Sequence, residues 1–285
     1  MSPLFRNLAS SLLVAGLAAV ASAAPATKPL KVLLVTGGCC HDYANQKDLL
    51  KAGLEKRINV VVDHLHTPDK STKPPLECLT NPGYAKGYDL VIHDECAAAA
   101  DDPALVANVL KPHVDGTPGV ALHCAMHSYR VVKDFARPQA PGSPGALWFD
   151  FLGLQSSGHG PQSPVAITYT NASHPITKGL SNWTTINEEL YNNVQPPSVY
   201  PRHTSLATGR QTQTNKKDGT KKEAEAVIAW TNEFGPKKAR VFATTMGHNN
   251  DTVQDPRYLE LVARGVLWAA GKLEADGKPS AGYGR

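Results

Sequence analysis

The chain has 285 residues, of which 41% are hydrophobic and 19% are charged, and its net charge is +4. These proportions are typical of a globular protein and exclude a coiled coil, a collagen-like chain and an intrinsically disordered chain. The small net charge, with no arginine-rich stripe and no interleaved aromatic residues, argues against nucleic acid as a partner. A chain of this length buries enough core to fold as one domain without a disulfide or a structural metal.

The first 23 residues have the pattern of a secretory signal peptide. Arg6 supplies the positive charge, an apolar run extends from Leu8 to Val20, and Ala21-Ser22-Ala23 is an A-x-A cleavage site. The apolar run is shorter than the roughly 20 residues that a membrane-spanning helix needs. We therefore expect residues 1–23 to be removed. The mature protein is then expected in the periplasm or outside the cell, without membrane contact.

The cysteines are an odd set for an oxidising compartment: Cys39, Cys40, Cys78, Cys96 and Cys124. At least one thiol is therefore expected to be free or to pair with another chain. No C-x-x-C pair is present, which argues against a zinc ribbon or a thioredoxin-like site. Cys78 and Cys96 are candidates for a disulfide, although spacing alone does not decide the pairing. We interpret Cys39 and Cys40 as buried small residues, with a redox role as the alternative.

Short apolar runs alternate with helical patterns in the first half of the chain. Apolar residues at helical spacing predict helices over 47–56 and 103–110. Asp101 or Asp102, followed by Pro103, is a typical helix start. Runs of aliphatic residues predict buried strands at Lys31–Thr36, Asn59–Asp63, Tyr88–His93 and Gly119–His123. This alternation predicts an α/β fold with a mostly parallel central sheet that is covered on both faces.

The second half of the chain is more mixed. It contains predicted strands at 165–169, 227–230 and 240–244, and an amphipathic helix over Tyr258–Leu273. The polar, lysine-rich stretch Gly209–Lys222 is predicted to be a solvated loop. Because no long linker divides the chain, we expect one domain over residues 28–273. Residues 274–285 are expected to form a disordered tail.

Polar side chains follow several of the predicted strands directly. In an open parallel sheet, ligands bind at the carboxyl ends of the strands, and these ends lie at one edge of the sheet. Imidazoles from distant segments of the chain are therefore expected to meet there. The residues in question are His41 and Asp42, Asp94 and Glu95, His123, and His248 and Asn249.

A series of short motifs runs along residues 30 to 272: Val35-Thr36-Gly37-Gly38 through His41-Asp42, Gly119–His123, His174–Leu180, Glu188–Tyr191, Ala229–Gly235, Arg240–Phe242 and Gly247–Asn249. In this order and spacing the chain resembles the ThuA-like (trehalose-utilisation-type) family of the class I glutamine amidotransferase-like superfamily. The resemblance implies a flavodoxin-like three-layer sandwich. It also implies a role in carbohydrate metabolism, with a disaccharide or a keto sugar as the substrate and no nucleotide cofactor.

The resemblance draws attention to the turn after the fourth predicted strand. In amidotransferases of this superfamily a nucleophilic cysteine occupies that turn. Here His123 occupies it, and Cys124 follows one position later. A shift of one residue redirects a side chain, and an imidazole does not replace the thiolate as the acyl acceptor. We therefore expect that the protein is not a glutaminase.

Histidine is the commonest ligand of zinc and related divalent metals in proteins. We therefore predict that His41, His123 and His248 bind a divalent metal, zinc before others, with Glu189 as a nearby carboxylate. A catalytic metal site keeps one position open beside its protein ligands. In this hypothesis the catalytic residues are His123, Glu189 and His127, and the substrate-binding residues are Asp42, Asp94, Glu95, His159 and Asn249.

Other interpretations of the same residues stay open. A metal-assisted enzyme could catalyse hydrolysis, isomerisation or elimination on a small carbohydrate. A second hypothesis is a hydrolase that depends on Cys124, with His127 or His159 as its base. A third is a sugar-binding accessory protein without catalysis. The sequence does not specify an oligomeric state.

Overall fold

A single mixed sheet forms the centre of the molecule. The computed structural model describes residues 27–214 and 218–285, and within these residues nine strands join into one sheet. The strands are β1 (Leu30–Gly38), β2 (Val60–His66), β3 (Leu90–Cys96), β4 (Gly119–Leu122), β5 (His159–Tyr169), β6 (Trp183–Tyr191), β7 (Thr204–Thr214), β8 (Lys221–Phe234) and β9 (Ala239–Thr244). Their order across the sheet is β2-β1-β3-β4-β9-β8-β7-β5-β6.

The sheet has a parallel half and an antiparallel half. β1 pairs in parallel with β2 and β3, and the parallel arrangement continues through β4 to β9. β8, β7, β5 and β6 each run antiparallel to their neighbours. β3 and β4 are buried along their whole lengths, because helices cover both faces. β4 therefore appears in the sequence as an unbroken apolar run, whereas the apolar run of β3 gives way to polar residues from His93 to Glu95. The mixed α/β fold predicted from the sequence is found.

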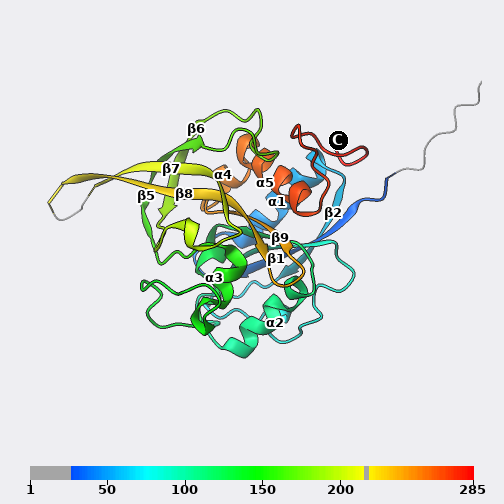
Figure 1. The fold of residues 1–285 in the computed structure, drawn as a ribbon, viewed down its shortest axis with the longest axis horizontal. Coiled ribbons are helices and arrows are strands. Elements are labelled where there is room, and N and C mark those ends of the chain that lie inside the picture. The colour runs from blue at the N-terminus through cyan, green and yellow to red at the C-terminus, as the bar shows by residue number, and fades with distance from the viewer. Residues whose placement is uncertain (1–26, 215–217) are drawn as a thin grey trace, which may run out of the picture.

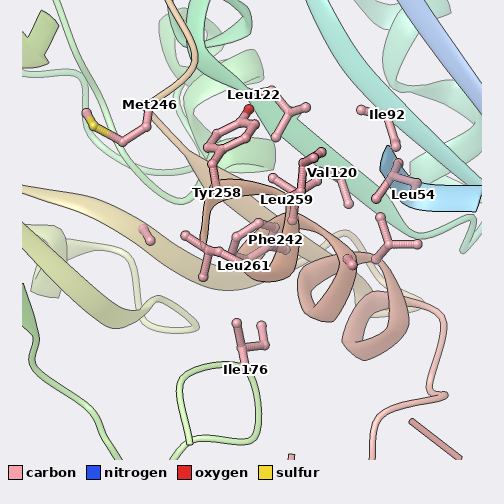
Figure 2. Packing of buried hydrophobic residues seen from close by; sticks show 14 of the residues in the cluster. Leu54, Ile92, Val120, Leu122, Ile176, Phe242, Met246, Tyr258, Leu259 and Leu261 are labelled. Atoms are coloured by element: carbon pink, nitrogen blue, oxygen red, sulfur yellow. The ribbon is translucent and has the colours of Figure 1, made fainter. Parts of the chain in front are cut away.

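Helices cover the two faces of the parallel half (Figure 1). On one face lie α1 (Tyr43–Arg57), α4 (Asn250–Val253) and α5 (Pro256–Ala269), and on the other lie α2 (Pro103–Val114) and α3 (Leu147–Leu152). Successive side chains of a strand point to opposite faces, so Val32 packs with the α1 and α5 side while Leu33 packs with the α2 and α3 side. Figure 2 shows the first of these cores, in which Leu259 of α5 lies beside Phe242 of β9.

Two of the helices, α2 and α5, begin with an aspartate N-cap followed by a proline. The Asp102 side chain accepts a hydrogen bond from the backbone N–H of Ala104 at 2.8 Å, and Pro103 is the first residue of α2. Asp255 caps α5 in the same way, and Pro256 follows it. A proline is favoured there because the first N–H of a helix has no partner within the helix.

The polar stretch Gly209–Lys222 differs from its prediction. It is not a loop: its ends belong to β7 and β8, which pair as a long antiparallel hairpin that projects from the sheet. Cross-strand pairs, such as Arg210 with Glu225 at 2.9 Å, support the hairpin on its exposed faces. Buried positions of this part of β7 are occupied by Gly209 and the polar Gln211, so the stretch lacks the apolar alternation from which a strand is recognised. β6 was not predicted either.

The last twelve residues also differ from their prediction, because residues 274–285 are held against the sheet. The backbone N–H of Asn59 donates to Tyr283 O at 2.9 Å, and Arg285 N–H donates to Arg57 O at 3.0 Å. Gly284 forms an antiparallel bridge with Ile58. The expectation of a disordered tail rested on a Gly- and Lys-rich composition. Composition does not reveal that unpaired backbone groups before β2 offer this segment partners.

The predicted signal peptide, residues 1–23, lies outside the described residues. Among the residues that are described, no helix combines the length and the apolar character that crossing a bilayer requires.

Gly265 allows α5 to lie close to the sheet, because a Cβ atom there would overlap the ring of Phe242. Alanine is the better helix former by about 1 kcal/mol, whereas overpacking a core costs about 1–3 kcal/mol. We expect Gly265→Ala to lower the free energy of unfolding by up to about 2 kcal/mol, measured by chemical denaturation. Gly158→Ala is the control, since a Cβ there meets no atom within 4 Å. A Gly265→Ala protein as stable as the wild type would contradict this packing.

Candidate functional site

The carboxyl ends of β1, β4 and β9 each lead directly into a turn that carries a histidine. His41 follows β1, His123 begins the short 3-10 helix after β4, and His248 follows β9. Gly38 has φ of +97°, and a Cβ there would overlap the carbonyl of Cys96, so glycine is required before His41. His123 itself has φ of +40°, a left-handed conformation that is rare for a residue with a side chain. The sharp turn expected at His123 is therefore present.

The three imidazoles lie against one another. The ring centroids are 4.6 Å apart for His41 and His123, 4.7 Å for His41 and His248, and 5.4 Å for His123 and His248. Each ring offers one nitrogen, and these three nitrogens all lie within 4.8 Å of one another. The structure thus brings together the imidazoles that the sequence analysis expected to converge. Their spacing suits three ligands of a single cation.

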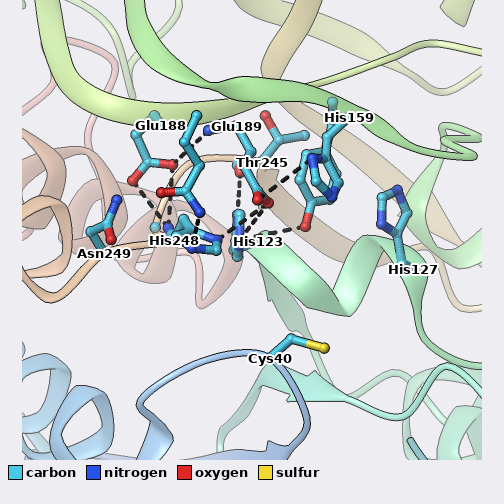
Figure 3. A network of polar contacts seen from close by, with 12 residues as sticks. Cys40, His123, His127, His159, Glu188, Glu189, Thr245, His248 and Asn249 are labelled. Carbon is cyan, nitrogen blue, oxygen red and sulfur yellow. Dashed lines mark hydrogen bonds and ion pairs between the residues drawn. The ribbon is translucent and has the colours of Figure 1, made fainter. Parts of the chain in front are cut away.

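Glu189 of β6 places its carboxylate among imidazoles (Figure 3). Its Oε2 is 3.7 Å from His123 Nε2 and 3.2 Å from His248 Nδ1. Its Oε1 is 3.5 Å from Nδ1 of His159, which begins β5. Glu189, from the antiparallel half of the sheet, therefore lies in the same cluster as the histidines that follow strands of the parallel half.

A second group of residues orients this cluster, and sequence reasoning missed all of them. The carbonyl of Thr245 accepts a hydrogen bond at 2.7 Å from His123 Nδ1, which leaves Nε2 of the neutral ring free for the cluster. Glu188 accepts from the backbone N–H of His248 at 3.0 Å, and the Tyr191 hydroxyl lies 3.4 Å from His123 Nε2. Glu188 and Tyr191 belong to β6. The motif Glu188–Tyr191 was the one signal in the sequence that pointed to this strand.

Helix α1 also takes part in holding the loop after β9. The side-chain amide of Gln46 is buried and donates to the backbone carbonyl of His248 at 3.0 Å. The Gln162 side-chain amide lies 2.7 Å from His248 Nε2 on the other side of the ring. His248 is therefore fixed from both sides, although it lies in a turn.

The electrostatics of the cluster favour neutral imidazoles at two of the three positions. Burial, together with the imidazoles of His123 and His248, lowers the pKa of His41 to about 2. Burial lowers the pKa of His123 to about 4. The hydrogen bond to Glu189 instead raises the pKa of His248. For Glu189, burial alone would raise the pKa, but the hydrogen bond from His248 and the surrounding imidazoles lower it.

The cluster faces a polar cavity of about 850 Å³. Asp42 and Asn249, both predicted to bind substrate, line it with His41 and His248. The Asp42 carboxylate accepts hydrogen bonds from the side chains of Asn45 and Asn250, and Asn249 donates to the carbonyl of Asn187 at 2.7 Å. The remaining lining residues are Cys40, Lys70, Gln162, Ile186, Asn187, Asn250 and Asp251. Such a wall offers hydrogen bonds from several polar side chains, which suits a hydroxylated ligand.

Asp94 and Glu95 do not reach this cavity, which corrects their prediction as substrate-binding residues. β3 extends to Cys96, three residues beyond the predicted end of that strand, so both residues lie within the sheet and not after it. Asp94 pairs with Thr36 of β1 and is 5% exposed. Glu95 is fully buried, lies 2.8 Å from His93 Nδ1 and accepts a hydrogen bond from Tyr129.

The rings of His127, His159 and Tyr191 lie close together. The ring of His127 stacks on Tyr191, with centroids 4.2 Å apart and planes inclined by 4°, and its Nε2 is 2.9 Å from Ser156 Oγ. The ring centroid of His127 is also 6.3 Å from that of His159. Figure 3 places His127 outside the network of hydrogen bonds and ion pairs around Glu189. His159 is 41% exposed and borders a second cavity of about 370 Å³.

The cysteines differ from the two sequence-based expectations, which were Cys39 and Cys40 as buried small residues and a candidate Cys78–Cys96 disulfide. Cys39 and Cys40 form a disulfide with each other, while Cys78 and Cys96 are free and buried, so the suggested Cys78–Cys96 pair does not form. Cys124 is buried, and its hydrogen bond with Cys96, together with burial, raises its pKa well above the usual value. A protonated thiol of this kind is a poor nucleophile, which disfavours the Cys124-dependent hydrolase.

Comparisons with known proteins identify the family and the fold. The family model described as "ThuA: Trehalose utilisation" matches residues 31–269. A solved ThuA-like protein from Parabacteroides merdae is 20% identical and superposes with a TM-score of 0.61, over 90% of this chain and 97% of the other. A ThuA-like protein from Bacteroides uniformis is 19% identical, with a TM-score of 0.57, over 89% and 96% of the two chains.

A third structure, described as a component of GMP synthase from Thermoplasma acidophilum, is 12% identical, with a TM-score of 0.50, over 86% of this chain and 96% of the other. No curated protein matches the chain. The chain belongs to the ThuA family, as the sequence motifs indicated, and it shares its fold with these solved structures. Membership of this family connects the protein with carbohydrate metabolism.

The contrasting pKa shifts within the cluster make a direct prediction for the metal-free protein. In an NMR titration with a chelator present, we expect His248 to gain its proton above pH 6.5, while His123 stays neutral until the pH falls to about 4. Removing the negative charge in Glu189→Gln should lower the pKa of His248. Glu225→Gln, on the exposed hairpin, is the control and should leave it unchanged. If His123 gained its proton before His248, the proposed electrostatics would be wrong.

Proposed function

We propose that the protein is a metal-assisted enzyme that moves a proton on a small carbohydrate, a disaccharide or its keto derivative. One observation carries the proposal. His41, His123 and His248, from turns after β1, β4 and β9, place three ring nitrogens within 4.8 Å of one another, and the Glu189 carboxylate lies 3.7 Å from His123 and 3.2 Å from His248. His41 and His248 line the polar cavity of about 850 Å³. Membership of the ThuA family supports the substrate class.

The residues of the cluster suit a divalent cation such as zinc. His41, His123 and His248 are the three ligands of this proposal, and nitrogen ligands with a nearby carboxylate are a common zinc set. Nδ1 of His41 is buried and has no hydrogen-bond partner, which is costly unless something else satisfies it. The low pKa values of His41 and His123 keep both rings in the neutral form that binds cations. A cation held there would polarise an oxygen of the bound substrate.

The chain's own residues would then carry out proton transfer and substrate binding. Glu189 is ionised at neutral pH and accepts a proton from a carbon or a hydroxyl next to the polarised oxygen. His159 lies 3.5 Å from Glu189 and is half exposed, so it can relay that proton to solvent. Asp42 and Asn249 hold the hydroxyl groups of the sugar. This division favours isomerisation or elimination, because glycoside hydrolysis uses a pair of carboxylates around the scissile bond.

Location and architecture complete the proposal. The signal-peptide pattern of residues 1–23 supports a periplasmic or secreted protein. The helices on both faces of the parallel strands support a flavodoxin-like three-layer sandwich for that half. A sugar-binding protein without catalysis is the alternative function, since the cavity alone would serve it.

Cation binding is the first test of this function. We expect the metal-free protein to bind one zinc ion per chain in a calorimetric titration. His41→Ala and His123→Ala should each weaken binding by at least the 10- to 100-fold typical of lost second-layer contacts. His64→Ala, at the edge strand β2, is the matched control and should bind zinc like the wild type. Stoichiometric binding that survives both ligand substitutions would contradict the site.

Turnover separates the functional hypotheses. We expect the metal-loaded protein to consume a keto disaccharide and to exchange a carbon-bound hydrogen with deuterated water, observed by NMR. Glu189→Gln should abolish this exchange while zinc still binds, whereas Cys124→Ser should retain most of it. Loss of activity in Cys124→Ser, with its fold intact, would support the thiol hydrolase instead. Sugar binding without exchange under any condition would support the accessory protein.

A further inference from the structure

Four of the five cysteines gather next to the histidine cluster, in the same group of turns. Cys39 and Cys40 form the disulfide that precedes His41, and Cys124 follows His123. Cys96 ends β3, where it pairs with Gly38 of β1, and its Sγ lies 3.4 Å from Cys39 Sγ. The carbohydrate chemistry proposed above uses none of these sulfurs.

Cys96 is a free thiol, and it contacts Cys39 of the Cys39–Cys40 disulfide. Exchange begins when a thiolate attacks one sulfur of a disulfide, so the attacking sulfur must be able to touch it. Cys96 meets this condition, because its Sγ lies 3.4 Å from Cys39 Sγ. It does so from a buried position, with only 3% of the residue exposed. The hydrogen bond from Cys124, and the charge of Arg130, lower the pKa of Cys96 and support its role as the attacking thiol.

The two sulfurs of the disulfide differ in their surroundings. Cys39 packs against the buried group formed by Tyr43, Cys96 and Cys124, whereas Cys40 is exposed and lines the 850 Å³ cavity. An attack on Cys39 therefore releases the sulfur that can reach solvent. Figure 3 shows Cys40 near the histidine and glutamate network but not within it.

We propose that the Cys39–Cys40 disulfide and the Cys96 thiol form an exchange site that releases Cys40 as a reactive thiol at the cavity. The Sγ–Sγ bond between Cys96 and Cys39 forms, and the bond between Cys39 and Cys40 breaks. The proton that Cys96 loses ends on Cys40. The step consumes no oxidant or reductant, because one disulfide and one thiol are present before and after it.

The exchange would also regulate the proposed cation site, and this consequence rests on the proposed function. Cys40 precedes His41 directly, and both residues line the cavity. The sulfur of the released Cys40 is a soft ligand and would compete with substrate for the position that the imidazoles leave open. The exchange itself requires no cation.

Native labelling tests the exchange. The folded protein, purified without reductant, is incubated with excess N-ethylmaleimide and a chelator, then digested without reduction and analysed by mass spectrometry. Because the reagent traps Cys40 irreversibly, even a minor exchanged population should accumulate as Cys40 labelled and Cys39 linked to Cys96. Cys96→Ser should abolish the labelling of Cys40. Cys78→Ser, which removes a free thiol that contacts Tyr129 outside this group, should leave it unchanged.

The remaining outcomes overturn the proposal. They are a wild-type protein that keeps only the Cys39–Cys40 link with Cys40 unlabelled, one in which Cys39 and Cys40 are both free, and one in which Cys124 replaces Cys96 in the new link. The wild-type result is decisive even if Cys96→Ser does not fold. Because the chelator is present throughout, failure of zinc binding and failure of exchange give separate results.

Discussion

The structure of the site depends on one constraint: parallel strands end at the same edge of a sheet. β1, β4 and β9 therefore deliver His41, His123 and His248 to one place, although more than 200 residues separate the first from the last along the chain. Two features then fix the orientation of the His123 ring. They are the left-handed backbone of His123 and the hydrogen bond from its Nδ1 to the carbonyl of Thr245. Removing water from the cluster then keeps two of the three imidazoles neutral.

The antiparallel half of the sheet supplies what the parallel half lacks. β6 contributes Glu189, whose charge is stabilised by neighbouring imidazoles despite burial, and Tyr191, on which the ring of His127 stacks. The same strand contributes Glu188, which accepts a hydrogen bond from the backbone N–H of His248. An arrangement of fixed imidazoles, one carboxylate and a polar cavity is suited to polarising an oxygen and moving a nearby proton. The sulfur atoms beside it add a second kind of chemistry within reach of the same cavity.

Much of the parallel half, and of the histidine cluster, could be predicted from local patterns. Aliphatic runs such as Lys31–Thr36 are strands because both of their faces are buried, and Asp102 with Pro103 begins a helix through local hydrogen bonding. The length of a strand was harder to predict from the sequence, because the acidic end of β3 carries no local pattern that indicates burial. Asp94 and Glu95 looked like residues of a loop, but neighbouring strands extend the sheet past them.

The sequence by itself determined the class of fold, the family and the identity of the three clustered histidines, because hydrophobic patterning and strand-end motifs act over a few residues. Tertiary structure alone decided that Glu189 faces those histidines, that His127 stacks on Tyr191, that residues 274–285 pair with the segment before β2, and that Cys96 touches Cys39. Each of these contacts joins segments that are distant along the chain. They depend on how strands are ordered and how far they extend, which is set by packing and backbone pairing across the whole sheet.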